Sequence, residues 1–453
     1  MVAEIPACFK AYDIRGRVPD ELGPGLARDI GRAFAACFSP KKVAVGRDIR
    51  LSGASLCSEL VEGLLESGVD VLDLGLCGTE EIYHAAFSLE DKGVDGGIVV
   101  TASHNPSDYN GMKFVTRGAQ PVSGDSGLQE MAEMIVADTL PEPATTRGRV
   151  TTATTKDDYI SHLLSYVKTD GLKPLKLVVN SGNGCAGPVV DLLEAHLPFS
   201  FVRMFHEPDG TFPNGVPNPL LPEKRAETGR MVRESGADLG IGWDGDFDRC
   251  FFWDENGRFI EGYYIVGLLA TALLKDHPGS RILHDPRLVW NTRELVGENG
   301  GVPIETRTGH ALIKERMREE DALYGGEMSA HHYFRDFGYC DSGMIPWLLV
   351  CSLMSRSGKP LARMVDERIS AYPVSGEINS TVDDPQAAID RVEAAFSQGK
   401  KEYIDGLSVT FDRFRFNIRQ SNTEPLLRLN VESRRDAELM RAKTDELLAL
   451  IRE

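Results

Sequence analysis

The sequence predicts an α/β protein: three similar α/β domains with mixed, largely parallel sheets, and then a smaller C-terminal α+β domain, all around a central cleft. The chain has 453 residues, and a single core stops growing at about 250–300 residues, so three or four domains are expected. Strand-like and helix-like stretches alternate, and the alternation restarts twice before residue 370. Beyond that point, runs of adjacent strands are flanked by helices, which is typical of an α+β domain. The expected domains are residues 1–152, 153–256, 257–368 and 369–453.

The first domain begins with short apolar strands around a helix. Strands are predicted at 43–46, 71–75 and 96–101, and a helix is predicted at 54–67. The strand at 96–101 is rich in β-branched residues and runs into a polar loop. Residues 139–157 are rich in threonine and proline and poor in large apolar side chains, so a linker is predicted there.

The later domains are predicted from the same periodicities. The second domain has strands at 176–179, 200–205 and 239–243, with helices from about 187 and at 223–235. The third has helices at 263–275, 291–297 and 311–320 and strands at 281–284, 302–306 and 322–325. The fourth has strands at 376–382, 407–410, 413–420 and 426–432, with helices at 385–397 and 434–452.

Composition and charge exclude several classes of protein. A net charge of −18 argues against a nucleic-acid partner, because nucleic-acid binders carry a basic excess. No apolar run approaches the ~20 residues of a membrane helix, and no signal-peptide pattern is visible, so a cytoplasmic protein without a membrane contact is expected. The eight cysteines are scattered, which fits neither a zinc knuckle nor a redox pair. The sequence does not decide the oligomeric state, and a monomer is our expectation.

A polar loop with reactive groups follows the strand at 96–101. It offers a hydroxyl at Ser103, an imidazole at His104 and a cation at Lys113. Ligands of open α/β sheets gather at the carboxyl ends of the strands, where this loop lies. A serine nucleophile needs such an accessible place and stabilisation of the charge that it carries. The residues alone equally fit a plain turn, because their types are favoured in turns.

Three aspartates follow the apolar strand 239–243. The carboxylates of Asp244, Asp246 and Asp248 can converge on one hard cation, Mg²⁺ or Ca²⁺, once the chain curls. An EF-hand begins similarly, but it needs a glycine where this chain has Arg249, and it needs flanking helices. A solvated acidic turn would not need this position between two apolar stretches. We therefore predict a divalent-metal site, with Arg249 as a partner for phosphate.

The third domain contains two further polar loops. Glu327 and Ser329 lie on one loop and can make the paired hydrogen bonds that vicinal sugar hydroxyls require. His331 could carry a proton near neutral pH. Arg307 and His310 form a companion loop. For any one histidine alone, a packed ring in a polar turn is the simpler interpretation.

A fourth cluster combines arginines with small polar side chains. Arg419 and Arg428 flank Ser421, Asn422 and Thr423. Hydroxyl, amide and backbone N–H groups, helped by guanidinium groups, are how proteins hold a free phosphate. Each residue alone fits an exposed strand end, but the cluster predicts a phosphate-binding site.

These four loops together resemble the signature loops of a known family. The segments TASHNP (101–106), DGDFDR (244–249), GEMS (326–329) and RQSNTEP (419–425) stand in the order found in the α-D-phosphohexomutases, and YDIRG (12–16) matches as well. The chain is most similar to the bacterial phosphomannomutase/phosphoglucomutase branch, whose members feed GDP-mannose and exopolysaccharide synthesis. The resemblance implies that the fourth domain is TATA-binding-protein-like. Two positions depart from the family pattern: Ala330 stands where glycine is frequent, and Arg307 stands where many relatives have lysine.

The resemblance also implies a role for each matched residue. It makes Ser103 the phosphorylated donor and acceptor of the phosphoryl group. The implied Mg²⁺ ligands are Asp244, Asp246, Asp248 and the phosphate on Ser103. Glu327 and Ser329 are implied to contact the sugar O3 and O4. The other implied substrate-binding residues are Tyr12, Arg307, His310, Arg419, Ser421, Asn422, Thr423 and Arg428. The implied catalytic surroundings of Ser103 are Arg15, His104, Lys113, Arg249 and His331.

The activity that the resemblance implies is reversible phosphoryl transfer between O1 and O6 of hexose phosphates. Mannose 1-phosphate and mannose 6-phosphate, and the corresponding glucose phosphates, are the expected small-molecule partners. Mg²⁺ and a hexose 1,6-bisphosphate, which is both intermediate and activator, are the expected cofactors. Two alternatives are a metal-dependent sugar-phosphate phosphatase and a non-catalytic sugar-phosphate binder with a structural Ca²⁺ in the 244–255 loop.

Overall fold

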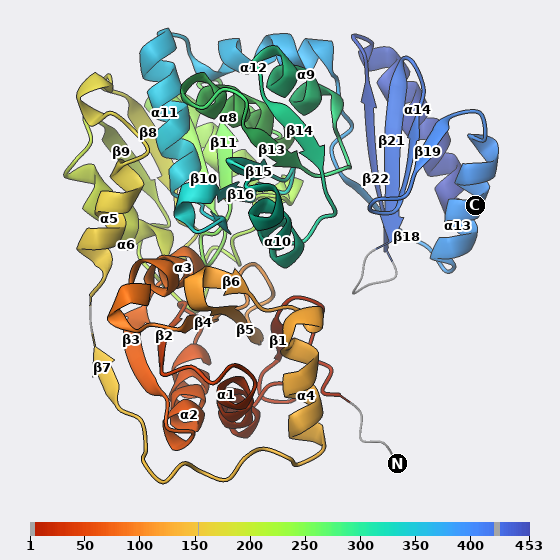
Figure 1. The fold of residues 1–453 in the computed structure, drawn as a ribbon. Coiled ribbons are helices and arrows are strands. Elements are labelled where there is room, and N and C mark those ends of the chain that lie inside the picture. Colours follow the sequence, from red (N-terminus) through yellow and green to blue (C-terminus); the bar gives the residue numbers. More distant parts are fainter. Residues whose placement is uncertain (1–4, 153, 421–425) are drawn as a thin grey trace. The chain divides into compact units, whose positions relative to one another are not determined.

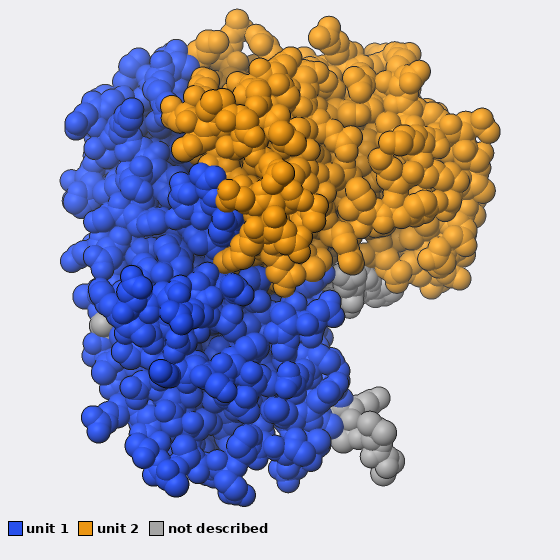
Figure 2. Space-filling model, in the orientation of Figure 1, with its two compact units in different colours: residues 1–259, 331–358 blue, residues 260–330, 359–453 orange. Residues whose placement is uncertain are grey.

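The computed structural model describes residues 5–152, 154–420 and 426–453. The chain divides into two compact units, which we describe one at a time (Figure 2). Unit 1 contains residues 1–259 and 331–358, and unit 2 contains residues 260–330 and 359–453. The helices and strands are labelled in Figure 1.

Unit 1 begins with a mixed sheet. Its strands are β1 (Ile14–Arg17), β2 (Lys42–Arg47), β3 (Asp70–Leu76), β4 (Gly96–Val100), β5 (Tyr109–Thr116), β6 (Gln120–Pro121) and β7 (Val150–Thr152). Their order is β1-β5-β4-β2-β3-β7, with β6 beside β5. The pairs among β2, β3, β4 and β7 are parallel, whereas β5 runs antiparallel to β1, β4 and β6. The predicted mixed, largely parallel sheet is thus confirmed for this part of the chain.

Helices cover both faces of this sheet. Val43 and Val45 of β2 pack into a core with helices α1 (Pro24–Phe38), α2 (Gly53–Glu66) and α4 (Leu128–Val136). Ala44, between them, points to the opposite face and packs with helix α3 (Thr79–Ser88). A strand that is buried on both faces has a continuous run of apolar residues, and this run is why β2 could be predicted from the sequence.

The second sheet of unit 1 carries the three aspartates. Strands β8 (Lys176–Asn180), β9 (Ser200–Met204) and β10 (Leu239–Trp243) are parallel, and β11 (Cys250–Trp253) runs antiparallel to β10. Helices α5 (Lys156–Leu164), α6 (Ala186–Glu194) and α7 (Ala226–Ser235) belong to this region. Unit 1 also contains β16 (His332–Phe334), β17 (Cys340–Asp341) and helix α11 (Ile345–Ser357). The short strand β12 (Phe259–Ile260) lies at the boundary between the units.

The predicted linker at 139–157 is partly wrong. Strand β7 pairs with β3 inside this stretch, and α5 starts at Lys156. All three residues of β7 are exposed. A short edge strand without a buried face leaves no alternation of apolar and polar residues, so the sequence pattern could not indicate it.

Unit 2 begins with a third α/β region. Strand β13 (Arg281–His284) pairs in parallel with β14 (Val302–Glu305) and β15 (Tyr324–Gly326). The helices of this region are α8 (Gly262–Asp276), α9 (Trp290–Glu298), α10 (His310–Glu320) and α12 (Leu361–Ala371). The parallel pairing brings the loops that follow all three strands to one edge of the sheet.

The C-terminal region of unit 2 is an antiparallel sheet covered by two helices. Its strands are β18 (Ile378–Thr381), β19 (Lys400–Glu402), β20 (Leu407–Thr410), β21 (Phe414–Gln420) and β22 (Leu426–Ser433), in the order β18-β22-β21-β20-β19. Helices α13 (Pro385–Ala395) and α14 (Ala437–Arg452) pack against one face of it (Figure 1). The side chains of Asp384 and Asp436 cap the two helices by accepting backbone N–H bonds. The predicted C-terminal α+β region is confirmed.

All eight cysteines are free thiols. Among the helices of the described residues, none is both long and apolar enough to cross a membrane.

Candidate functional site

The loop that carries Ser103 connects β4 to β5 and holds this serine in a strained conformation. Ser103 has a φ of 48°, in the left-handed region that few residues other than glycine adopt. The backbone N–H of Ser103 donates to Thr101 Oγ1 at 2.9 Å, and this hydroxyl in turn donates to Asp48 Oδ2 at 2.7 Å. The loop is therefore anchored to the end of the neighbouring strand β2.

Arg50 also holds this loop, and its role was not predicted from the sequence. Its guanidinium donates to the carbonyl oxygens of Ser103 at 2.9 Å and Asn105 at 2.7 Å. It also donates to the carbonyl oxygens of Ala102, Pro106 and Tyr109. Arg50 is 2% exposed, and Asp48 is its buried counter-ion. A signal for it existed, because Asp48 and Arg50 follow the carboxyl end of a predicted strand, as Ser103 does.

The three predicted metal ligands lie beside Ser103. Asp244, Asp246 and Asp248 are all buried, on the turn between β10 and β11. The Ser103 hydroxyl donates to Asp244 Oδ2 at 2.7 Å. Lys113, on β5, donates to Asp246 Oδ2 at 2.8 Å and also contacts Asp248. The structure thus brings the predicted nucleophile, the three carboxylates and the predicted cation together.

The carboxylates have free capacity for a cation. One oxygen each of Asp244, Asp246 and Asp248 is buried and has no hydrogen-bond partner in the part of the chain that the structure describes. The three residues offer ligand atoms within 4.8 Å of one another. Burial and the two neighbouring aspartates raise the pKa of Asp244 to about 7. Unpaired buried oxygens that repel one another are the donor set that a hard divalent cation satisfies. The residues therefore fit Mg²⁺, and the flanking strands exclude an EF-hand.

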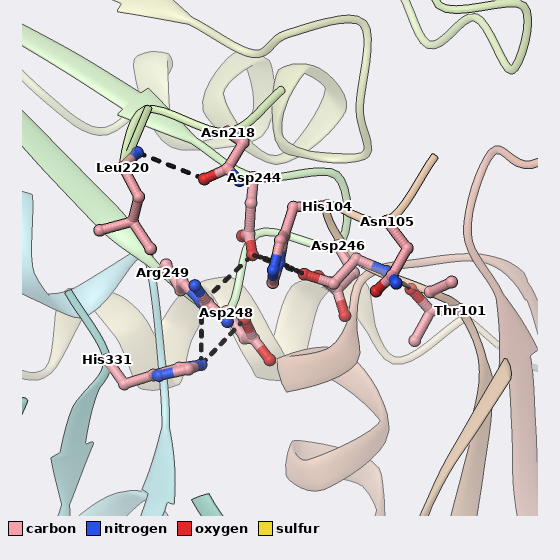
Figure 3. Close-up of polar contacts among 12 residues, drawn as sticks. Thr101, His104, Asn105, Asn218, Leu220, Asp244, Asp246, Asp248, Arg249 and His331 are labelled. Carbon is pink, nitrogen blue, oxygen red and sulfur yellow. Dashed lines mark hydrogen bonds and ion pairs between the residues drawn. The ribbon is translucent and has the colours of Figure 1, made fainter. Parts of the chain in front are cut away.

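Arg249 and His331 complete one side of this group (Figure 3). Arg249 Nε lies 3.5 Å from Asp244 Oδ2 and donates to His331 Nε2 at 3.1 Å. His331 Nε2 is also 3.5 Å from Asp248 Oδ1. The same ring nitrogen therefore lies between a guanidinium donor and a carboxylate acceptor.

His104 and Arg15 also lie close to the serine loop. His104 Nδ1 is 3.0 Å from Ser103 Oγ. Burial, followed by the charges of Arg249 and Arg15, lowers the pKa of His104 well below its ordinary value, so its ring is neutral. Arg15 is held by Asp13 at 2.7 Å and donates to the side chain of Asn105, on the serine loop. Tyr12 lies just before β1 and is half-buried.

Unit 2 contains the loop that was predicted to bind the sugar. It also contains Arg287, a second arginine that was not predicted from the sequence. Glu327 and Ser329 follow β15. Arg287 Nη2 lies 3.4 Å from Ser329 Oγ and 3.7 Å from Glu327 Oε1. Asp285 binds Arg287 through both of its oxygens and accepts the backbone N–H of Met328 at 2.7 Å. Arg287 follows the carboxyl end of β13. A search for charged residues just after strand ends would therefore have indicated both Arg50 and Arg287.

The predicted phosphate cluster is described in part. Arg419 on β21 is directly opposite Arg428 on β22 in the strand register. Arg419 Nη1 also lies 3.4 Å from Thr308 Oγ1, in the loop that contains the exposed Arg307 and ends at His310, the first residue of α10. The predicted residues Ser421, Asn422 and Thr423 lie outside the described residues.

Comparison with known proteins agrees with this arrangement. Family models described as phosphoglucomutase/phosphomannomutase match four consecutive segments: alpha/beta/alpha domain I at residues 6–139, domain II at 157–257, domain III at 261–372 and the C-terminal domain at 377–449. The chain is 58% identical over 452 residues to a phosphomannomutase of Salmonella montevideo, covering 98% of both chains. It is 57% identical over 450 residues to a protein named phosphohexose mutases from Xanthomonas campestris pv. campestris, covering 99% of both.

A solved structure is similar over nearly the whole chain. The phosphoglucomutase/phosphomannomutase family protein of Burkholderia thailandensis superimposes with a TM-score of 0.88 at 35% identity, over 98% of this chain and 96% of the other. The loop of Ser103, the loop of the three aspartates and the loop of Glu327 and Ser329, together with these matches along the whole sequence, place the chain in the phosphoglucomutase/phosphomannomutase family, the α-D-phosphohexomutases.

Proposed function

We propose that this protein is a phosphohexomutase that moves a phosphoryl group between O1 and O6 of mannose phosphates and glucose phosphates. The observation that carries the proposal is the 2.7 Å contact of Ser103 Oγ with Asp244 Oδ2, inside a buried group of carboxylates and cations. A structural serine needs no such surroundings, whereas a serine that exchanges a phosphoryl group needs positioned charges of both signs. Family membership and relatives named as phosphomannomutases support the same activity.

Ser103 is the residue that gives and takes the phosphoryl group. In the first half of the reaction, the bond between phosphorus and Ser103 Oγ breaks as a bond between phosphorus and a sugar hydroxyl oxygen forms. The proton of that hydroxyl passes to a neighbouring base. The neutral ring of His104 and the ring nitrogen of His331 beside Arg249 are the candidate acceptors that lie beside this centre.

The product of this first half is a hexose 1,6-bisphosphate. It turns end over end, and the bond between its other phosphorus and the sugar oxygen breaks as a new bond to Ser103 Oγ forms. The base returns its proton to the released sugar oxygen, so atoms and charges balance over the cycle. Lys113, Arg15 and Arg249 neutralise the charge that spreads over the phosphoryl oxygens. When bound to Asp244, Asp246 and Asp248, Mg²⁺ supplies further positive charge to the same oxygens.

Ser103 is 1% exposed in this structure. Its hydroxyl must therefore leave Asp244 and turn toward the partly exposed side of the loop, where the side chain of His104 is 26% exposed. In the absence of a metal, phosphorylation favours this change, because a phosphate and the Asp244 carboxylate repel one another when no cation lies between them.

Taken by itself, unit 2 carries polar side chains of the types that recognise a sugar phosphate. Glu327 and Ser329 suit two neighbouring sugar hydroxyls, O3 and O4, which keep a similar arrangement in both orientations of the sugar. The proposed contacts of Glu327 and Ser329 do not involve O2, the position at which mannose and glucose differ. Both sugars are therefore expected as substrates. Arg287, Arg419 and Arg428 suit the phosphate that is not transferred.

The test is to supply mannose 1-phosphate and glucose 1-phosphate separately, with Mg²⁺ and a trace of hexose 1,6-bisphosphate. Formation of the 6-phosphates supports the proposal, and their absence with both sugars overturns it. Inorganic phosphate that appears at the rate of substrate loss would instead indicate a phosphatase. Ser103→Ala should abolish turnover while it keeps sugar-phosphate binding, which separates the enzyme from a non-catalytic binder.

A further inference from the structure

Glu377 lies among the arginines that suit a substrate phosphate. It directly precedes β18, and its Oε2 accepts a hydrogen bond from Arg287 Nη1 at 3.2 Å. Oε2 is also 3.6 Å from Arg419 Nη2, and Oε1 is 3.6 Å from Arg428 Nη1. One carboxylate thus faces three guanidinium groups that come from three different parts of unit 2.

The arginines need such a counter-ion. The side chains of Arg287 and Arg419 are only 3% and 12% exposed, and buried like charges are costly unless an opposite charge is close. Burial raises the pKa of Glu377, but the three arginines outweigh this effect and hold the pKa below its ordinary value. The carboxylate is therefore charged whenever the protein is folded near neutral pH.

The contacts of Glu377 leave part of the arginines' hydrogen-bonding capacity unused. The distances to Arg419 and Arg428 exceed those of good charge-assisted hydrogen bonds. The Nε groups of both arginines are buried and have no hydrogen-bond partner among the described residues. A phosphate has three oxygens and twice the charge, so it would satisfy these donors better than one carboxylate does. The side chain of Glu377 is 24% exposed and therefore has room to move aside.

We propose that Glu377 is an internal stand-in for the substrate phosphate: it neutralises Arg287, Arg419 and Arg428 in the free protein and competes with the phosphate for them. This inference rests on the proposed function and adds a positioning residue to it. A mutase must release the non-transferred phosphate each time the bisphosphate turns, because the two ends of the sugar exchange places. Without Glu377, Arg287 would keep Asp285 and Arg419 would keep only the more distant Asp405, 3.9 Å away, so the site would carry more uncompensated positive charge and hold that phosphate longer. Glu377 lowers the affinity for phosphate and leaves the arginines neutralised at the moment of release.

The first test is a calorimetric titration of the protein with inorganic phosphate in the absence of divalent metal. Glu377→Gln keeps the size of the side chain and removes its charge. We expect it to bind phosphate roughly tenfold more tightly than the natural protein, because one charge at 3–4 Å in a partly screened site is worth about that factor. Glu393→Gln is the matched control, because it removes one carboxylate from the same region that pairs only with Lys401 and Tyr403 in the contacts described. This control should leave phosphate affinity unchanged.

The second test is the kinetics of the Glu377→Gln protein. We expect KM for mannose 1-phosphate to fall and kcat to fall with it, because tighter binding slows reorientation and release. A residue needed only for folding would not lower KM. Adding Arg419→Met to Glu377→Gln should cancel the gain in phosphate affinity, which would locate the effect at the arginines.

Weaker or unchanged phosphate binding in Glu377→Gln would overturn the proposal, because it would mean that Glu377 only holds the arginines in place. If that variant does not fold, Glu377→Asp shortens the same carboxylate by one methylene and should tighten phosphate binding by a smaller factor. The phosphate titration requires no turnover. A failure of the proposed mutase activity would therefore be seen separately, in the sugar-phosphate assay.

Discussion

Arg50 donates a hydrogen bond to the carbonyl oxygen of Ser103 at 2.9 Å, so a buried cation holds the backbone of the residue that we propose to carry phosphate. The same guanidinium binds three further carbonyl oxygens of the loop between β4 and β5 and that of Tyr109, the first residue of β5. Together with the bond from the Ser103 N–H to Thr101 Oγ1, these contacts hold the loop in which Ser103 has a left-handed φ of 48°. Arg50 is therefore a positioning residue for Ser103.

The first prediction concerns Arg50→Lys. A lysine keeps the charge but cannot reach several carbonyl oxygens with a planar fork. We expect kcat to fall by about 100-fold, as happens when a reacting group is displaced by about 1 Å, while KM for mannose 1-phosphate changes little. Arg117→Lys, at an exposed ion pair with Glu90, is the control and should behave like the natural protein. If variants elsewhere in this loop lose as much kcat and as much thermal stability as Arg50→Lys does, Arg50 has no specific effect and the prediction is wrong.

The second prediction concerns Mg²⁺. Three buried carboxylate oxygens that have no partner among residues 5–152, 154–420 and 426–453 destabilise the metal-free protein, so Mg²⁺ should raise the thermal unfolding temperature and chelation should lower it. Asp246→Asn should reduce this metal-dependent shift by at least half, because it removes one ligand charge. Differential scanning calorimetry with and without Mg²⁺ measures the effect. An equal shift in the two proteins would mean that the metal binds elsewhere.

The third prediction concerns Glu80, which joins several parts of unit 1. Its carboxyl group accepts the backbone N–H of Gly343 at 2.6 Å and the Ser342 hydroxyl at 3.0 Å, and it also contacts the Tyr159 hydroxyl. Burial outweighs these donors and raises the pKa of Glu80 to about 8. In the folded protein the group therefore keeps its proton up to about pH 8, whereas in the unfolded chain it loses the proton near its ordinary pKa of 4.5.

This difference in the pKa of Glu80 determines how the stability of the protein changes with pH. The stability that protonated Glu80 contributes is fully present below about pH 4.5 and is lost as the pH rises toward 8. Glu80→Gln cannot ionise, so the free energy of unfolding of the natural protein relative to this variant should fall by about 1–3 kcal/mol from pH 5 to pH 8. Urea unfolding at several pH values measures it. A constant difference across that range would show that Glu80 does not change its protonation on unfolding.

Much of the site was predictable because it lies at strand ends. Ser103 and Asp244 each follow a continuous apolar strand, and such strands are visible in a sequence because both of their faces are buried. Their proximity across two sheets was not visible from spacing, since a gap of 141 residues separates them. It came from the resemblance of the loops to a known family, and the structure agrees with it.

The supporting arginines were not predicted, and the reason is physical. Arg50 and Arg287 act through contacts with backbone carbonyls and with side chains far along the chain, and a single arginine in a polar loop is usually a surface residue. Glu377 was missed for the same reason, because its three partners come from separate strands and loops. Only the folded arrangement distinguishes these charged residues from the solvated ones.

The last prediction concerns Ala330, which stands where glycine is frequent in the family. Its φ is 70°, in the left-handed region, and it is 2% exposed in the turn that carries Glu327 and Ser329. A Cβ in that region costs about 1–2 kcal/mol. Ala330→Gly relieves this strain, but it also removes a buried methyl group and makes the unfolded chain more flexible.

Ala322→Gly separates these effects. Ala322 is also fully buried and outside the helices of unit 2, but it is not among the residues with positive φ. Both substitutions remove one buried methyl and add the same flexibility, whereas only the first relieves strain. We therefore expect Ala330→Gly to be less destabilising than Ala322→Gly by about 1–2 kcal/mol in urea unfolding. Equal losses would mean that Ala330 is not strained, and that the turn beside Glu327 tolerates alanine without any cost.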